Sequence, residues 1–148
     1  MGGMTAQPLV IGFGNTLRRD DGVGPRVARR LAEHGVATVI EAFQLLPEHI
    51  EAAASAGLVV LVDAAVDLAP GEVRRRKLDP AGPGSPTVDL HELPPAALAT
   101  AARELYGSSP EVWLISVGVA DLELGEGLSS EVEDALPRAA AAVLELVG

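Results

Sequence analysis

The stretch Leu58-Val59-Val60-Leu61-Val62 is apolar at every position and is followed by Asp63. A strand with this pattern is usually buried on both faces, as in the middle of a parallel sheet. Strand-like and helical patterns alternate on either side of it along the chain. Such alternation is typical of α/β proteins, in which helices cover both faces of a mostly parallel sheet. The stretch therefore predicts the central strand of an α/β fold.

The remaining elements are predicted from apolar periodicity, turn residues and capping signals. A strand over 72–78 carries four consecutive positive charges, Arg74 to Lys77, which is typical of a protected sheet edge. Ser130 and Glu133 predict a capping box for the last helix, and Pro137 predicts a kink or a later start. The expected strands are 9–11, 37–42, 58–62, 72–78 and 112–117, and the expected helices are 23–34, 47–56, 93–105 and a last one from about 130.

These elements add up to one domain over 1–148, because single domains commonly contain about 100–200 residues. We expect a three-layer α/β domain with a mostly parallel, twisted five-stranded sheet and helices on both faces.

The composition excludes several classes of function. The chain has no cysteine, which rules out disulfides, thiolate nucleophiles, cysteine zinc sites and iron–sulfur clusters, and fits a reducing compartment. Its net charge of −10 should repel nucleic acid and anionic lipid, and aromatic residues make up only 3%. No apolar run reaches the roughly 18–20 residues of a membrane span, and no signal peptide is recognised. We therefore expect a cytoplasmic protein that binds neither nucleic acid nor membranes.

The first segment of interest follows the first predicted strand. Gly12-Phe13-Gly14-Asn15-Thr16-Leu17 begins like a dinucleotide fingerprint, but Leu17 stands where that motif needs glycine. Asp20 and Asp21 come next, and their carboxylates would repel a pyrophosphate. The glycines would also fit a tight turn, with one of the two acids capping the following helix.

Two further candidates lie at predicted strand or loop ends. Asp63 ends the most buried strand, where a charge must be paired, hydrogen-bonded or bound to a metal. His91 follows a loop rich in glycine and proline. Ligands of open α/β sheets bind at the carboxyl ends of the strands, so Asp21, Asp63 and His91 can converge there. Two carboxylates and an imidazole suit a divalent metal ion, although a structural aspartate and a solvated histidine remain alternatives.

Several well-known catalytic motifs are missing from the sequence. Ser116 lies in Leu114-Ile115-Ser116-Val117-Gly118, which is not a nucleophile elbow. The pair His91-Glu92 is not followed by the second histidine of a zinc protease motif, and no phosphate-binding P-loop is present.

The segment from Gly12 to Gly24 resembles the N-terminal motif of the hydrogenase maturation endopeptidases, which process the large subunit of nickel–iron hydrogenases. The resemblance continues through Val62-Asp63-Ala64 and His91 in the same order. Gln44-Leu45-Leu46-Pro47-Glu48 also resembles the Q-L-x-P-E stretch of one branch of that family. Asp89 is a departure, because many members have serine or threonine there.

The resemblance implies an endopeptidase that removes a short C-terminal extension from the large-subunit precursor after nickel has been inserted. It implies Asp21, Asp63 and His91 as the metal ligands, and we expect the same three residues to be catalytic. An acid/base pair of Asp21 with Asp63 or Asp20, working without a metal, is the alternative. We expect the nickel to come with the precursor and none to be tightly bound to the free enzyme. Further candidates for the substrate loop are Gly14, Asn15, Asp20 and Gln44.

Two other functions remain possible from the sequence alone. The first is a nucleotide-binding α/β module, suggested by Gly12 and Gly14. The second is a relative that binds a metal or a partner without catalysis. An acid–acid–histidine set argues against the second, and a cleavage assay would decide it.

Overall fold

The computed structural model describes residues 7–36, 38–80 and 93–148. In that part of the chain the elements follow the predicted order. They are β1 (Leu9–Phe13), the 3-10 turn η1 (Arg19–Gly22), α1 (Val23–Glu33), β2 (Val39–Ala42), α2 (Pro47–Ala54), β3 (Leu58–Ala65), β4 (Val73–Leu78), α3 (Pro95–Tyr106), β5 (Glu111–Gly118) and α4 (Ser130–Val147).

The five strands form one sheet in the order β2-β1-β3-β5-β4. β3 is central and pairs in parallel with β1 and β5, as its uninterrupted apolar run predicts. β4 lies at one edge and is the antiparallel strand, paired with β5. The predicted α/β fold with a mostly parallel sheet and a charged edge strand is therefore confirmed.

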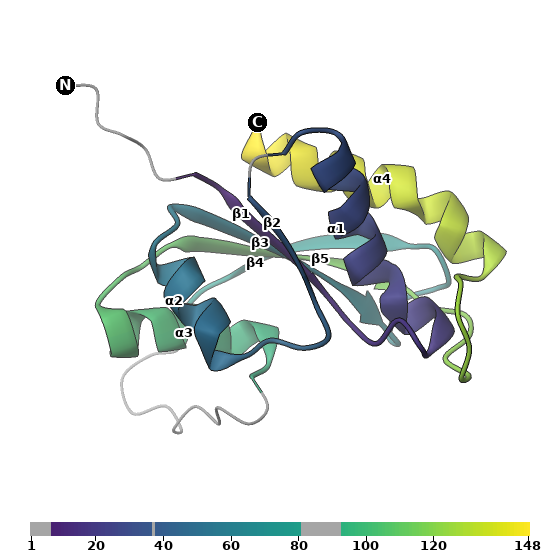
Figure 1. The fold of residues 1–148 in the computed structure, drawn as a ribbon, viewed down its shortest axis with the longest axis horizontal. Helices are drawn as coiled ribbons and strands as arrows, with labels where there is room; N and C mark the ends of the chain where they lie inside the picture. Colours follow the sequence, from purple (N-terminus) through teal and green to yellow (C-terminus); the bar gives the residue numbers. More distant parts are fainter. Residues whose placement is uncertain (1–6, 37, 81–92) are drawn as a thin grey trace.

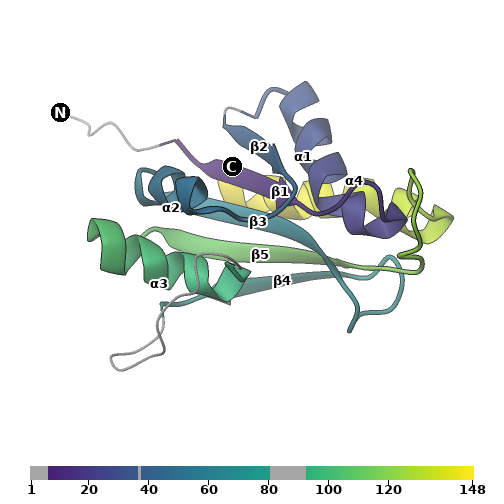
Figure 2. The same cartoon turned by 60° about the horizontal axis from the view of Figure 1, so that its bottom comes forward.

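Helices cover both faces of the sheet. Figures 1 and 2 show α1 and α4 together on one face and α2 and α3 on the other. Side chains of β3 alternate between these two layers, because successive residues of a strand point to opposite faces. Val60 and Val62 belong to the core beneath α1 and α4, whereas Val59 and Leu61 belong to the core beneath α2 and α3. The side chain of Asp63 points to the same face of the sheet as those of Val59 and Leu61, the face covered by α2 and α3.

Two details differ from the sequence prediction. β3 runs on to Ala65, so Asp63 lies inside the strand and not after it. α4 begins at Ser130 and continues through Pro137, but the predicted capping box is absent. Ser129 occupies the N-cap instead, and its hydroxyl donates to another part of the chain. Among the helices in the described ranges, none is long and apolar enough to cross a membrane.

α1 packs very closely against the sheet at Gly24. A Cβ atom added at Gly24 would collide with the backbone carbonyl oxygens of Phe13 and Val62. Backbone atoms of two strands cannot move aside without disturbing the sheet, so this position requires glycine. The close contact places the start of α1, and the acidic segment before it, against the ends of β1 and β3.

Gly24→Ala should lower the free energy of unfolding by about 2 kcal/mol, because the added methyl group overpacks a rigid backbone contact. Urea denaturation followed by circular dichroism measures the change. Gly57→Ala is the matched control, since a Cβ atom there meets nothing within 4 Å, and its effect should stay within about 0.5 kcal/mol. Equal stability of the two variants would contradict the close-packing account.

Candidate active site

Two loops meet beyond the carboxyl ends of the parallel strands. One is the acidic segment after β1, residues 14–22, and the other follows β5, residues 119–129. Their backbones are hydrogen-bonded to each other: the Gly125 N–H donates to Leu17 O at 2.8 Å, and the Arg19 N–H donates to Gly125 O at 3.0 Å. The Asp20 N–H donates to Asp121 O at 3.0 Å. The two loops therefore form one structural unit.

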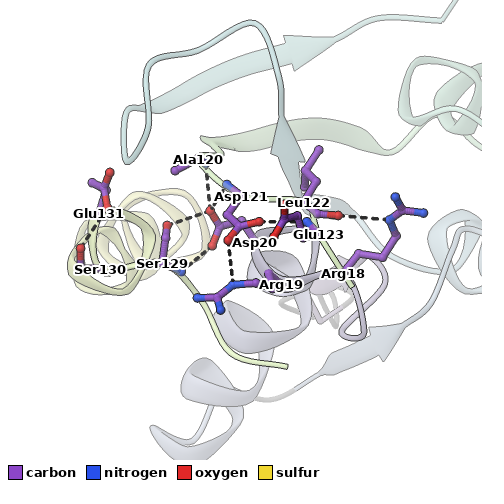
Figure 3. A network of polar contacts seen from close by, with 10 residues as sticks. All are labelled: Arg18, Arg19, Asp20, Ala120, Asp121, Leu122, Glu123, Ser129, Ser130 and Glu131. Carbon is purple, nitrogen blue, oxygen red and sulfur yellow. Dashed lines mark hydrogen bonds and ion pairs between the residues drawn. The ribbon is translucent and has the colours of Figure 1, made fainter. Parts of the chain in front are cut away.

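Asp20 fixes this unit through a buried carboxylate, drawn in Figure 3. Its side chain is fully buried. Oδ2 accepts hydrogen bonds from the Ala120 and Asp121 N–H groups, both at 2.9 Å, and from Ser129 Oγ at 2.7 Å. Oδ1 accepts from the Ser129 N–H at 2.6 Å. Burial raises the pKa of Asp20, but the hydrogen bonds from Ser129, Ala120 and Asp121 outweigh it, so the pKa is lowered and the carboxylate stays ionised.

The position of Asp20 corrects its assignment as a substrate-loop candidate. A buried carboxylate with four internal donors has no surface with which to contact a substrate. Asp20 does not cap a helix either, because neither η1 nor α1 has a side-chain cap. It is a structural residue that ties the two loops together.

Arg19 is strained within the same unit. Its φ of 42° lies in the left-handed region, and no other non-glycine residue of the described ranges has a positive φ. Such a conformation costs roughly 1–2 kcal/mol and persists only where the surroundings impose it. Here the hydrogen bond to Gly125 and the neighbouring Asp20 impose it, and an ion pair from Arg19 Nε to Asp121 Oδ2 at 3.2 Å orients the guanidinium.

Asp21 points in a different direction from its neighbour. Its Oδ2 accepts a hydrogen bond from the Asn15 N–H at 2.7 Å, and its side chain is partly exposed. Gly14 has a φ of 150°, and a Cβ atom there would collide with the backbone oxygen of Asp21. Gly14 and Asn15 thus shape the turn that holds Asp21. Gln44, the other candidate of this group, is exposed between β2 and α2.

Asp63 belongs to a row of polar residues across three strands. It pairs with Ser116 on β5, which in turn pairs with Arg74 on β4. Directly paired residues share a face of the sheet, so the three side chains lie side by side. Ser116 Oγ is buried and donates to Asp63 Oδ1 at 3.1 Å. Arg74 also binds Asp67 Oδ2 at 2.8 Å.

Burial raises the pKa of Asp63 to about 6. The Ser116 hydrogen bond and the positive charge of Arg74 oppose this shift, while the negative charge of Asp21 adds to it. Asp21 follows β1 and Asp63 lies near the end of β3, and these two strands are direct neighbours in the sheet. The convergence of their carboxylates at one site stays a prediction.

The third residue, His91, lies outside the described residues, as does Asp89. Within the described ranges no three histidine, cysteine, aspartate or glutamate side chains are grouped so that they could hold a metal ion. The convergence of His91 with Asp21 and Asp63 stays a prediction.

Ser116 and Arg74 were missed as site residues by the sequence interpretation. Ser116 is polar within the otherwise apolar run 112–117, and that isolated polarity was the available signal. Arg74 carried no separate signal, because the register that aligns it with Ser116 depends on long-range pairing.

The backbone of the acidic loop argues against a nucleotide site. A phosphate cradle needs free backbone N–H groups. Here those groups are already used: for example, the Gly14 N–H donates to Ala42 O at 3.0 Å and the Leu17 N–H to Asn15 Oδ1 at 2.9 Å. The N–H groups of residues 18–21 donate to carbonyl oxygens of the two loops.

Comparison with known families identifies the family of the chain. The family model HycI, hydrogenase maturation protease, matches residues 23–146, which is most of the chain. The chain belongs to the hydrogenase maturation protease family. It is therefore an endopeptidase, a hydrolase of peptide bonds, as the motif resemblance predicted.

Solved structures of hydrogenase maturation proteases have the same fold. HybD from E. coli has a TM-score of 0.73 at 24% identity, with 95% of this chain and 91% of HybD covered. HycI from Thermococcus kodakarensis has a TM-score of 0.71 at 28% identity, covering 96% and 92%. A hydrogenase 2 maturation peptidase from a Thaumarchaeota archaeon has a TM-score of 0.69 at 28% identity, covering 96% and 98%. A search of curated protein sequences gave no match.

Asp20→Asn should lower the free energy of unfolding at pH 7 by about 3 kcal/mol, because an amide nitrogen would face buried donors and the charge-assisted hydrogen bonds would be lost. Urea denaturation measures the change. Asp134→Asn is the control, since it removes the same charge from an exposed position of α4. A loss no larger than that of the control would contradict the structural role of Asp20.

Asp63→Asn should stabilise the protein at neutral pH. The folded state binds the Asp63 proton more tightly than the unfolded state, so the wild type loses stability as the pH rises from about 4 to about 6. The variant lacks this loss and can still accept the Ser116 hydrogen bond. Its advantage should be small near pH 4 and reach on the order of 2 kcal/mol above pH 7. An advantage that does not grow with pH would contradict the raised pKa.

Proposed function

We propose that the protein removes the C-terminal extension of a nickel–iron hydrogenase large-subunit precursor that already holds its nickel. The proposal is supported by the family to which the chain belongs and by the placement of Asp21 and Asp63 at the carboxyl ends of the neighbouring strands β1 and β3. The nickel belongs to the substrate, and its recognition restricts cleavage to loaded precursor.

The chemistry of the two aspartates suits a divalent ion brought by a partner. Asp21 uses Oδ2 for Asn15, and Asp63 uses Oδ1 for Ser116. No donor from the described residues reaches the second oxygen of either carboxylate, so each has a ligand atom to offer. Two carboxylates that repel each other gain from a shared cation, and His91 would add an imidazole nitrogen. The chain has no cysteine, so softer ligands to the nickel would come from the precursor.

Peptide hydrolysis needs an activated water, a polarised carbonyl group and a proton for the departing amine. Asp21, Asp63 and His91 are the proposed catalytic residues. A carboxylate beside the scissile bond can accept a proton from the attacking water and return it to the amine. Ser116 would keep Asp63 in position through its hydrogen bond to Oδ1.

Exposed apolar side chains around the site favour a protein substrate. Seven large apolar residues are exposed in the described part of the chain, and four of them lie in the loops after β1, β2, β3 and β5. Such residues are typical of protein interaction sites. These four are Leu17 (57% exposed), Phe43 (64%), Val66 (80%) and Leu124 (80%).

The proposed compartment is the cytoplasm, and the proposed partner is the precursor itself. The absence of cysteine fits the reducing conditions there.

Asp21→Asn, Asp63→Asn and His91→Ala should each lower the processing rate at least about 100-fold, because each removes a proposed ligand and catalytic group. Purified precursor is incubated with each variant, and mass spectrometry detects the shortened product. Asp134→Asn is the control for loss of one negative charge and should process at the wild-type rate.

The role of nickel is tested in the same assay with nickel-free precursor. We expect the wild-type enzyme to cleave loaded precursor and to leave nickel-free precursor intact. Equal cleavage of both would refute nickel recognition, and full activity of Asp21→Asn or Asp63→Asn would refute the proposed site.

A further inference from the structure

An open cavity of about 320 Å³ lies next to the acidic loop. Thr16 and Gly22 contribute to its wall, and Gly22 directly follows Asp21 in the sequence. Three arginines also line it, Arg19 from η1 and Arg26 and Arg29 from α1. A cavity of this size is large enough for a side chain or the end of a peptide.

Arginine side chains are concentrated around this cavity. The chain carries a net charge of −10, yet three arginines line the cavity and Glu126 is its single acidic lining residue. Each of these arginines is also ion-paired with an acidic side chain, Arg19 with Asp121, Arg26 with Glu133 and Arg29 with Glu41. The cavity therefore offers a ligand guanidinium donors and not a net positive charge.

Arg26 and Arg29 each form one ion pair and keep further N–H donors that a ligand could use. Arg26 Nη2 lies 3.1 Å from Glu133 Oε1, and Arg29 Nη2 lies 3.2 Å from Glu41 Oε1. Both pairs are exposed, so they hold the side chains in place weakly. A guanidinium has five N–H donors in a planar fork that matches a carboxylate, and the other donors of these two groups have no partner among the described residues.

Arg19 supplies an independent observation. It lines the cavity from the strained backbone position in the acidic loop, and its buried Nε lies 3.2 Å from Asp121 Oδ2 but has no hydrogen-bond partner among the described residues. Strained residues occur preferentially where a side chain must be aimed at a ligand.

We propose that this cavity binds a carboxylate group of the precursor and thereby sets the position of the scissile peptide at Asp21 and Asp63. The inference rests on the proposed function, because it names the contact through which the same substrate is held. The arginines do not take part in the chemistry, so their contribution is to substrate binding.

The test compares the Arg26→Gln/Arg29→Gln double variant with wild type in the processing assay. We expect KM for the loaded precursor to rise about tenfold, the equivalent of about 1.4 kcal/mol, with kcat unchanged. Raising the salt concentration should increase the wild-type KM and affect that of the variant less, because the lost contacts are ionic. Urea denaturation confirms that the variant is folded.

Arg30→Gln is the matched control. Arg30 lies on the same helix but lines a different cavity with His34 and Pro137. Its KM should stay within twofold of wild type. An unchanged KM in the double variant, or an equal rise in Arg30→Gln, would overturn the inference.

Failure of the proposed function gives a different result, because wild-type enzyme would then leave the precursor uncut. Calorimetric binding of the uncut precursor to wild type and the double variant still tests the cavity in that case, and equal affinities overturn the inference. Binding of the processed subunit identifies the source of the carboxylate. If the double variant binds the processed subunit more weakly than wild type does, the carboxylate lies in the body of the subunit. If the double variant is weaker only toward the uncut precursor, the carboxylate lies in the extension.

Discussion

The buried, ionised carboxylate of Asp20 is the interaction on which the site depends. A charge inside a protein is tolerated only when donors surround it, and here the donors come from Ala120, Asp121 and Ser129, about 100 residues further along the chain. The loop after β1 and the loop after β5 must therefore fold together. The next residue, Asp21, has a different partner and accepts a hydrogen bond from the Asn15 N–H.

The sheet contributes the second half of the site. Parallel pairing of β3 with β5 and antiparallel pairing of β5 with β4 align Asp63, Ser116 and Arg74 in one row. The row lies on the same face as the core beneath α2 and α3. Half-burial of Asp63 costs stability at neutral pH, and neither Ser116 nor Arg74 fully compensates for it. Such a cost is common where a residue is retained for function and not for packing.

The sequence predicted the architecture well because burial leaves a local pattern. The apolar run 58–62 identified the central strand, and the charges of 74–77 identified the edge. The end of β3 was predicted too early, because Asp63 interrupts the apolar run while Ala64 and Ala65 continue the pairing with β5. Local pattern also misplaced the cap of α4, since the hydroxyl of Ser129 is engaged by Asp20.

The different roles of the adjacent residues Asp20 and Asp21 could not be predicted from the sequence. The local sequence does not distinguish them, because only Asp20 forms hydrogen bonds with residues 120–129. The structure shows Asp20 buried and Asp21 partly exposed, and the role of Asp21 as a metal ligand stays a prediction. The arginine cavity could not be predicted from the sequence either, because its arginines come from η1 and α1 and its other wall comes from the loop after β5.

The most direct test of the account is an NMR titration of the Asp63 carboxyl carbon in wild type and in Asp21→Asn. The account places the pKa of Asp63 at about 6 in the wild type and at a lower value in the variant, because the negative charge of Asp21 helps to raise it. Asp134→Asn should leave it unchanged. An identical pKa of Asp63 with and without the Asp21 charge would show that the two carboxylates do not share one site.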